Sequence, residues 1–159
     1  MQLGQWREQL SREGVETVGI IATNAERARL YLRLRPTKLP LAADPDCNTH
    51  HAYGIGNVDY AVPEVLDEVQ KPQYNPAGEL AKPVSWPEAF PAYDKLDGFT
   101  YTKTDEEDVA RHQRSQMTGQ ALVDRDGVIR WLNTEMDHGA QALGGFPAVE
   151  ELLDLARSL

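Results

Sequence analysis

The chain has 159 residues, which is the size of one ordinary domain. Its formal net charge at pH 7 is −9, and such a surface repels polyphosphate, so we expect no nucleic-acid partner. No apolar run approaches the roughly 18 residues that span a bilayer, and residues 1–7 lack the hydrophobic region of a secretory signal. We therefore expect a soluble cytoplasmic protein without a membrane partner.

The N-terminal residues predict a helix followed by a strand. Leu3, Trp6 and Leu10 recur at helical spacing, and Gly14 stands where a helix would end. Residues 15–21 are apolar and β-branched, which is typical of a short buried parallel strand.

A second helix and strand follow. Thr23 and Glu26 form a capping-box pattern that begins a helix, and the helix should end before Pro36. Residues 39–43 predict another short strand. An Asp-Pro-Asp turn at 44–46 then caps a short helix that Gly54 closes.

The C-terminal part of the chain predicts a hairpin and a last helix. Residues 119–123 and 128–132 read as strands, and Gly127 supplies the positive φ of the turn between them. This turn also explains the acidic residues at 124–126 without a calcium loop. The final helix should begin at about Pro147 and carry one apolar stripe, formed by Val149, Leu152, Leu153 and Ala156.

The middle of the chain is rich in proline and has no long element. Short helices are expected at 63–69 and 85–96, and a firmer one should run from the capping box at Thr104 to about Gln116. Such a stretch is either a lid, binding loop or interface, or an insertion packed on the sheet edge. We expect residues 72–99 to cover the main sheet or a neighbouring subunit rather than to form an independent domain.

The order of these elements predicts an α/β fold. Parallel units followed by an antiparallel hairpin and a covering helix indicate one mixed sheet with helices on both faces. We expect a single domain over residues 1–159, with a long insertion at about 56–117 before the final hairpin.

Three segments resemble a known family: residues 14–20, residues 39–46 with 52–55, and residues 119–131. In order and spacing they are similar to the alkyl hydroperoxide reductase/thiol-specific antioxidant group, the peroxiredoxin-like redoxins of the thioredoxin superfamily. The resemblance covers most of residues 1–56 and 117–159. It implies a thioredoxin-like fold and a thiol-dependent peroxidase or disulfide oxidoreductase.

The chain departs from that family at the reactive cysteine. Family members place a strand before the first helix and a cysteine at its N-terminus, often as Cys-x-x-Cys, where backbone N–H groups and the helix dipole stabilise a thiolate. Met1 already lies within the corresponding helix, so the usual first strand and the motif are absent. We expect an N-terminally truncated chain, with loss of the redox centre as the alternative. Thr118 stands near the position of a family arginine.

Two functions therefore remain open. The first is a redoxin-type antioxidant oxidoreductase whose cysteine motif is missing here, so that this chain should lack activity. The alternative is a non-catalytic thioredoxin-like binding or interaction module. The resemblance implies a homo-oligomer, commonly a dimer, and a thiol reductant protein as a partner. We expect no cofactor.

Cys47 is the only cysteine, which excludes an internal disulfide or a two-cysteine redox cycle. We expect it in the first turn of the short helix, where the dipole would lower its pKa, although Asp44 and Asp46 would raise it. We interpret it as an ordinary, partly buried thiol, with a redox or resolving role as the alternative.

Other chemistry-bearing residues have plain explanations. Cys47 and His50 share a helix face with a spacing that metals use, next to His51, but His112 and His138 are distant in sequence, so we expect no metal site. Four arginines could attract an anion, but we interpret them as a solvated helix face: Arg27, Arg29, Arg33 and Arg35.

Overall fold

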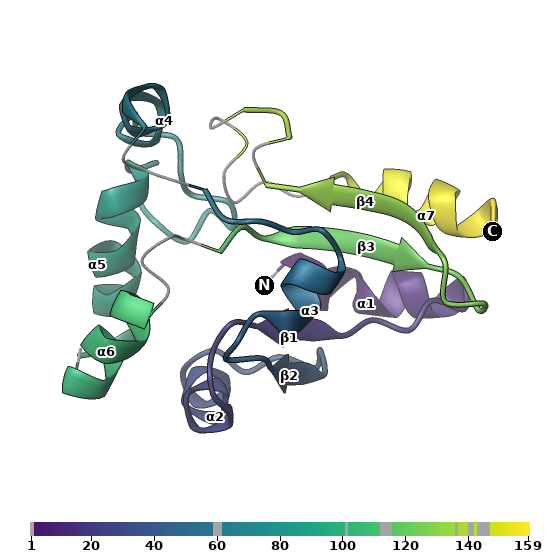
Figure 1. The fold of residues 1–159 in the computed structure, drawn as a ribbon, viewed down its shortest axis with the longest axis horizontal. Coiled ribbons are helices and arrows are strands. Elements are labelled where there is room, and N and C mark those ends of the chain that lie inside the picture. The colour runs from purple at the N-terminus through teal and green to yellow at the C-terminus, as the bar shows by residue number, and fades with distance from the viewer. Residues whose placement is uncertain are drawn as a thin grey trace. The chain divides into compact units, whose positions relative to one another are not determined.

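The structure is a computed structural model of the chain. It describes residues 2–58, 62–100, 102–111, 116–135, 137–139, 142 and 147–159. The helices (Figure 1) are α1 Gln2–Arg12, α2 Ala25–Leu34, α3 Asn48–Ala52, α4 Pro63–Val69, α5 Trp86–Asp97, α6 Lys103–Arg111 and α7 Val149–Arg157. The strands are β1 Gly19–Ile21, β2 Leu41–Ala43, β3 Gly119–Val123 and β4 Ile129–Thr134.

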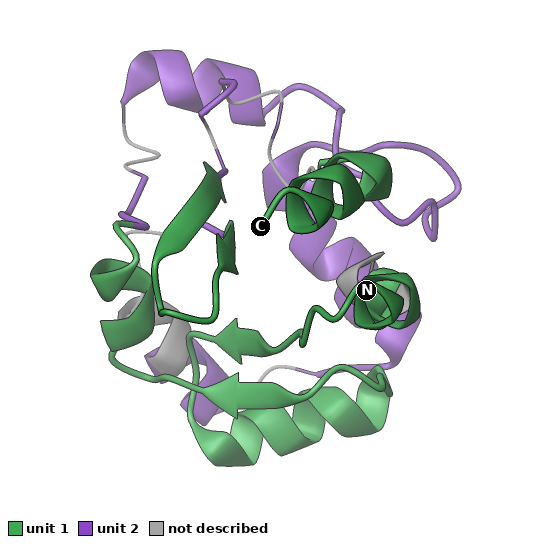
Figure 2. Ribbon diagram, turned by 90° about the vertical axis from the view of Figure 1, so that its right-hand side faces the viewer, with its two compact units in different colours: residues 1–54, 119–133, 146–159 green, residues 55–118, 134–145 purple. Residues whose placement is uncertain are grey.

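The chain divides into two compact units, coloured separately in Figure 2. Unit 1 contains residues 1–54, 119–133 and 146–159. Unit 2 contains residues 55–118 and 134–145. Within the described part of the chain, no helix is both long enough and apolar enough to cross a membrane.

The strands form two separate pairs. β1 and β2 are parallel, with Gly19 opposite Leu41 and Ile21 opposite Ala43. β3 and β4 form the antiparallel hairpin. The predicted α/β class with parallel and antiparallel pairing is confirmed, but no ladder joins the two pairs among the described residues, where one mixed sheet was expected.

Gly19 lets β1 lie close to the side chains around β2. A Cβ at this position would stand 2.6 Å from Leu41 Cδ2 and 3.1 Å from Leu39 Cδ2. Any larger residue would therefore displace Leu41 and the buried Leu39. The predicted strand at 15–21 is shorter than expected, because only its last three residues pair with β2.

The core of unit 1 includes the contact between α1 and α7. Leu10 on α1 and Leu152 on α7 are buried, with exposed fractions of 4% and 6%. At the ends of these helices, Arg157 donates to Glu13 over 2.7 Å. This ion pair is partly exposed, so it stabilises the contact between the two helices less than the burial of their apolar side chains does.

Helix starts deviate from the prediction by one or two residues. Asn24, not Thr23, caps α2, and its Oδ1 accepts from the Arg27 N–H at 3.0 Å. The α2 helix ends at Leu34, before Pro36, as predicted. At α7, Ala148 is the N-cap, so Pro147 lies outside the first turn where it was expected.

The hairpin turn is held by one carboxylate. Asp124 Oδ1 accepts from the backbone N–H groups of Asp126 and Val128, each at 2.9 Å, and Oδ2 accepts from Arg130 Nε at 2.6 Å. Gly127 has φ of 80°, as the predicted turn requires. Both carboxylate oxygens of Asp124 therefore accept hydrogen bonds within the hairpin itself.

In unit 2, α4 has the predicted bounds 63–69 and α5 agrees closely with 85–96. α5 begins with a capping box, in which Ser85 N and Oγ both donate to Glu88 Oε2. Edge-to-face aromatic contacts link the loop before α5 to the helix; they join Tyr74 to Trp86, Tyr74 to Tyr93, and Trp86 to Phe90.

In contrast to α2 and α7, α6 starts earlier than predicted. Its capping pair is Thr102 with Asp105, rather than Thr104 with Glu107, because the Asp105 carboxylate accepts from both the N–H and the hydroxyl of Thr102. α6 ends at Arg111, and Gln116 instead forms an isolated β-bridge with Asn57.

Candidate functional site

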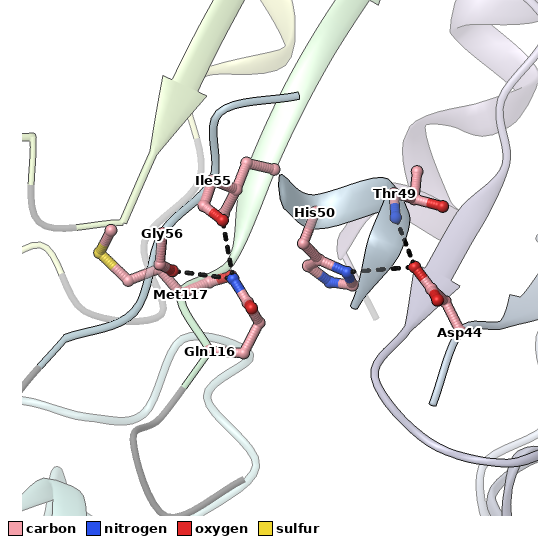
Figure 3. Close-up of polar contacts among 7 residues, drawn as sticks. All are labelled: Asp44, Thr49, His50, Ile55, Gly56, Gln116 and Met117. Carbon is pink, nitrogen blue, oxygen red and sulfur yellow. Dashed lines mark hydrogen bonds and ion pairs between the residues drawn. The ribbon is translucent and has the colours of Figure 1, made fainter. Parts of the chain in front are cut away.

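The candidate site in unit 1 is the turn that follows β2, here called the Asp44 turn and formed by residues 44–50. Asp44 Oδ2 accepts from the Thr49 N–H at 2.7 Å (Figure 3). The Asp44 carbonyl accepts from the Cys47 N–H at 3.2 Å. These bonds fold the chain directly from β2 into α3, as the Asp-Pro-Asp sequence predicted.

The turn brings a carboxylate and an imidazole together. His50 Nδ1 lies 3.8 Å from Asp44 Oδ2, and both side chains are 12% exposed. This distance is too long for a direct hydrogen bond, so the contact is an ion pair when His50 is protonated. The Thr49 N–H, and more weakly the His50 side chain, lower the pKa of Asp44. Asp44 therefore stays ionised over the physiological range.

Cys47 lies in this turn but not in the helix. It is the residue directly before α3, with φ of 55°, so the predicted place in the first helical turn is wrong. Its side chain is buried, at 4% exposure. Burial first, and then the charges of Asp44 and Asp46, raise the pKa of the thiol. The thiolate that redox chemistry needs is thus disfavoured at neutral pH.

Among the residues that the structure describes, no further histidines gather around Cys47 to complete a metal site. No group of three or more His, Cys, Asp or Glu side chains suited to a metal ion occurs among the residues the structure describes. His50 lies beside Asp44, whereas His51 and His138 are exposed. His112 lies outside the described residues.

Gln116, in unit 2, was not singled out from the sequence. Its Nε2 donates to the carbonyls of Ile55 at 3.0 Å and Gly56 at 2.8 Å, and the Met117 N–H also donates to Gly56 (3.1 Å; Figure 3). These bonds tie together the two ends of the segment predicted as an insertion. No sequence signal marks them, because the acceptors are backbone carbonyls 61 and 60 residues away.

Thr118, which the sequence resemblance suggested as the counterpart of an arginine, makes its contacts here through its backbone. Its N–H donates to the Glu135 carboxylate at 3.0 Å, and its carbonyl accepts from the Glu135 N–H at 2.7 Å. Glu135 is buried, with 8% exposure. Thr118 is therefore a structural partner of this carboxylate, and its short side chain cannot reproduce a guanidinium.

The Asp44 contacts predict a specific response to acid. Because the pKa of Asp44 is lower in the folded chain, this group stabilises the fold above its unfolded pKa, and the contribution is lost as pH falls through the folded pKa. As the pH falls from about 5 to about 2, the free energy of unfolding of Asp44→Asn should therefore decrease less than that of the wild type. Asp46→Asn, an exposed neighbour, is the control, and urea unfolding at each pH is the measurement. An unchanged pH slope in Asp44→Asn would contradict the assignment.

Unit 1 therefore contains a carboxylate–imidazole pair beside a buried thiol. Unit 2 contains a glutamine whose hydrogen bonds join the two ends of a long segment. Neither arrangement holds a nucleophile that is both exposed and activated. Comparison of the chain with protein-family models, with curated proteins and with solved structures finds no match.

Proposed function

We propose that the chain is a thioredoxin-like protein of the redoxin group and that its own thiol takes no part in peroxide or disulfide chemistry. The observation that carries the proposal is the arrangement of strands in unit 1, a parallel pair followed by an antiparallel hairpin and a last helix. This is the order that the family resemblance implies. The burial and raised pKa of Cys47 support the second part.

The division of the strands fits a redoxin sheet that lacks one strand. The Gly19 N–H donates to the Pro40 carbonyl, and the Ile21 carbonyl accepts from the Asp44 N–H. The backbone groups of Gly19 and Ile21 therefore point toward β2. Since backbone groups alternate along a strand, the N–H and C=O of Ile20 point to the opposite edge. An extended strand paired with β1 at that edge and with β3 would join both pairs into one mixed sheet.

The alternative function, a non-catalytic binding module, uses the same edge differently. There the extended strand would come from a protein partner, which adds to the sheet through backbone hydrogen bonds. The coding sequence immediately upstream of Met1 distinguishes the two. An in-frame strand followed by Cys-x-x-Cys supports the redoxin, and the lack of both favours the module.

The redoxin proposal includes self-association and a thiol reductant protein as a second partner. An unpaired strand edge invites pairing with another chain. Exposed apolar side chains accompany both strand pairs of unit 1: Val18 beside β1, and Val128, Ile129 and Leu132 at the hairpin. We therefore propose that two copies associate through these edges.

Sedimentation velocity at micromolar concentration tests this assembly. The wild type is expected to be a dimer or larger, and Val18→Lys should weaken association roughly tenfold, because a charge at a strand edge opposes pairing. Val62→Lys is the matched control, since Val62 is 41% exposed but belongs to unit 2. A monomeric wild type, or an equal effect of the two variants, would contradict the proposal.

A further inference from the structure

A cavity of about 450 Å³, half open to solvent, lies against the polar face of α1. Its walls come from two places in unit 1, the first helix and the loop before β2. The volume falls in the range of small-molecule sites. The residues that form the cavity are Gly4, Arg7, Glu8, Ser11, Arg12 and Lys38. We call it the Arg7 cavity.

The wall between helix and loop is closely packed. A Cβ at Gly4 would stand 2.7 Å from Thr37 Oγ1, so only glycine allows α1 this approach. Thr37 Oγ1 in turn accepts from the Leu39 N–H at 3.1 Å, and Leu39 is buried. The loop is thus fixed against α1, and it places Lys38 beside the arginines.

The Arg7 cavity is locally positive in a chain whose net charge is −9. Arg12 donates to Glu8 at 2.7 Å, which neutralises the one carboxylate in the lining. Neither Arg7 nor Lys38 has an acidic partner among the residues that the structure describes. The Nε of Arg7 is shielded from solvent, and it has no hydrogen-bond acceptor among the described residues.

Arg7 lines the cavity together with Lys38, and an anion bound there would balance both positive charges. We propose that the Arg7 cavity binds a small molecule through its phosphate group. Guanidinium groups match phosphate oxygens in geometry, and a dianion balances Arg7 and Lys38 together better than a single carboxylate does. The Ser11 hydroxyl provides a further donor. This site is separate from the proposed redoxin function and does not depend on it.

Calorimetric titration of the full chain with pyrophosphate, and separately with inorganic phosphate, tests the site. Saturable binding is expected. Arg7→Gln should weaken it at least roughly tenfold, because charge-assisted hydrogen bonds are lost. Lys38→Gln should weaken it severalfold, and its exposed position keeps the fold intact. Arg33→Gln, which removes the same charge from exposed α2, is the matched control and should bind as the wild type does.

Three results would overturn the proposal. The first is the absence of saturable binding by either phosphate probe. The second is an equal loss of affinity in Lys38→Gln and Arg33→Gln, which would indicate a general charge effect instead of a site. The third is binding of malonate as tight as that of pyrophosphate, which would assign the cavity to carboxylates.

Discussion

Replacement of Leu152 by alanine is expected to lower the free energy of unfolding by about 2–4 kcal/mol. Leu152 is 6% exposed on α7, which contacts α1. Truncation removes apolar burial and leaves a cavity that the helix pair cannot fully close. Chemical denaturation of the full chain, followed by circular dichroism, measures the change.

Leu159→Ala is the matched control for this substitution. Leu159 is 58% exposed at the end of the chain, so the same chemical change should alter the free energy of unfolding by less than about 0.5 kcal/mol. Equal effects of the two substitutions would show that Leu152 does not belong to the core of unit 1.

The second large effect is expected in unit 2. Asp105 is 1% exposed, and its Oδ2 accepts from the N–H of Thr102 at 2.6 Å and from the hydroxyl at 2.5 Å. Asp105→Ala removes both hydrogen bonds that cap the start of α6. We expect a loss of about 1–3 kcal/mol in the free energy of unfolding, measured in the same way.

Glu106→Ala separates this capping role from simple loss of charge. Glu106 is exposed and lies in the same first turn of α6. Its side chain interacts with the helix dipole, and its backbone N–H, which donates to the Thr102 carbonyl, is kept in the variant. Removal of the side chain should cost at most about 1 kcal/mol. A loss as large as that of Asp105→Ala would contradict the importance of the capping bonds.

Elements whose signals are local could be predicted from the sequence. α2 ends before Pro36, and Gly127 makes the hairpin turn, because proline and glycine act through their own backbone. The caps deviate where two candidates stand close together. Asn24 replaces Thr23, and Thr102 replaces Thr104, since only the three-dimensional path of the chain selects between neighbouring side chains that can cap.

Features that depend on distant partners could not be predicted. Pairing of strands into two sheets and the bonds of Gln116 join parts of the chain without a pattern in the intervening sequence. The left-handed backbone of Cys47 also has no signal, because it results from the Asp44 turn as a whole. By contrast, the polar stripe of the Arg7 cavity follows helical spacing along α1, and that spacing is visible in the sequence.

The proposed redoxin scaffold and the buried Cys47 are compatible only if catalysis, where it occurs, uses another thiol. A buried thiol with a raised pKa is protonated at neutral pH and reacts slowly with peroxide. The Asp44 turn stabilises this state, since its own carboxylate helps to disfavour the thiolate.

The most direct test is peroxide consumption by the chain and by Cys47→Ser in the presence of a thiol reductant. Both proteins are expected to match the background rate without protein, because neither offers a reactive thiolate. Circular dichroism of both proteins checks that the substitution preserves the fold. Robust turnover by the wild-type chain that disappears in Cys47→Ser would contradict the account, since it would make Cys47 a catalytic thiol.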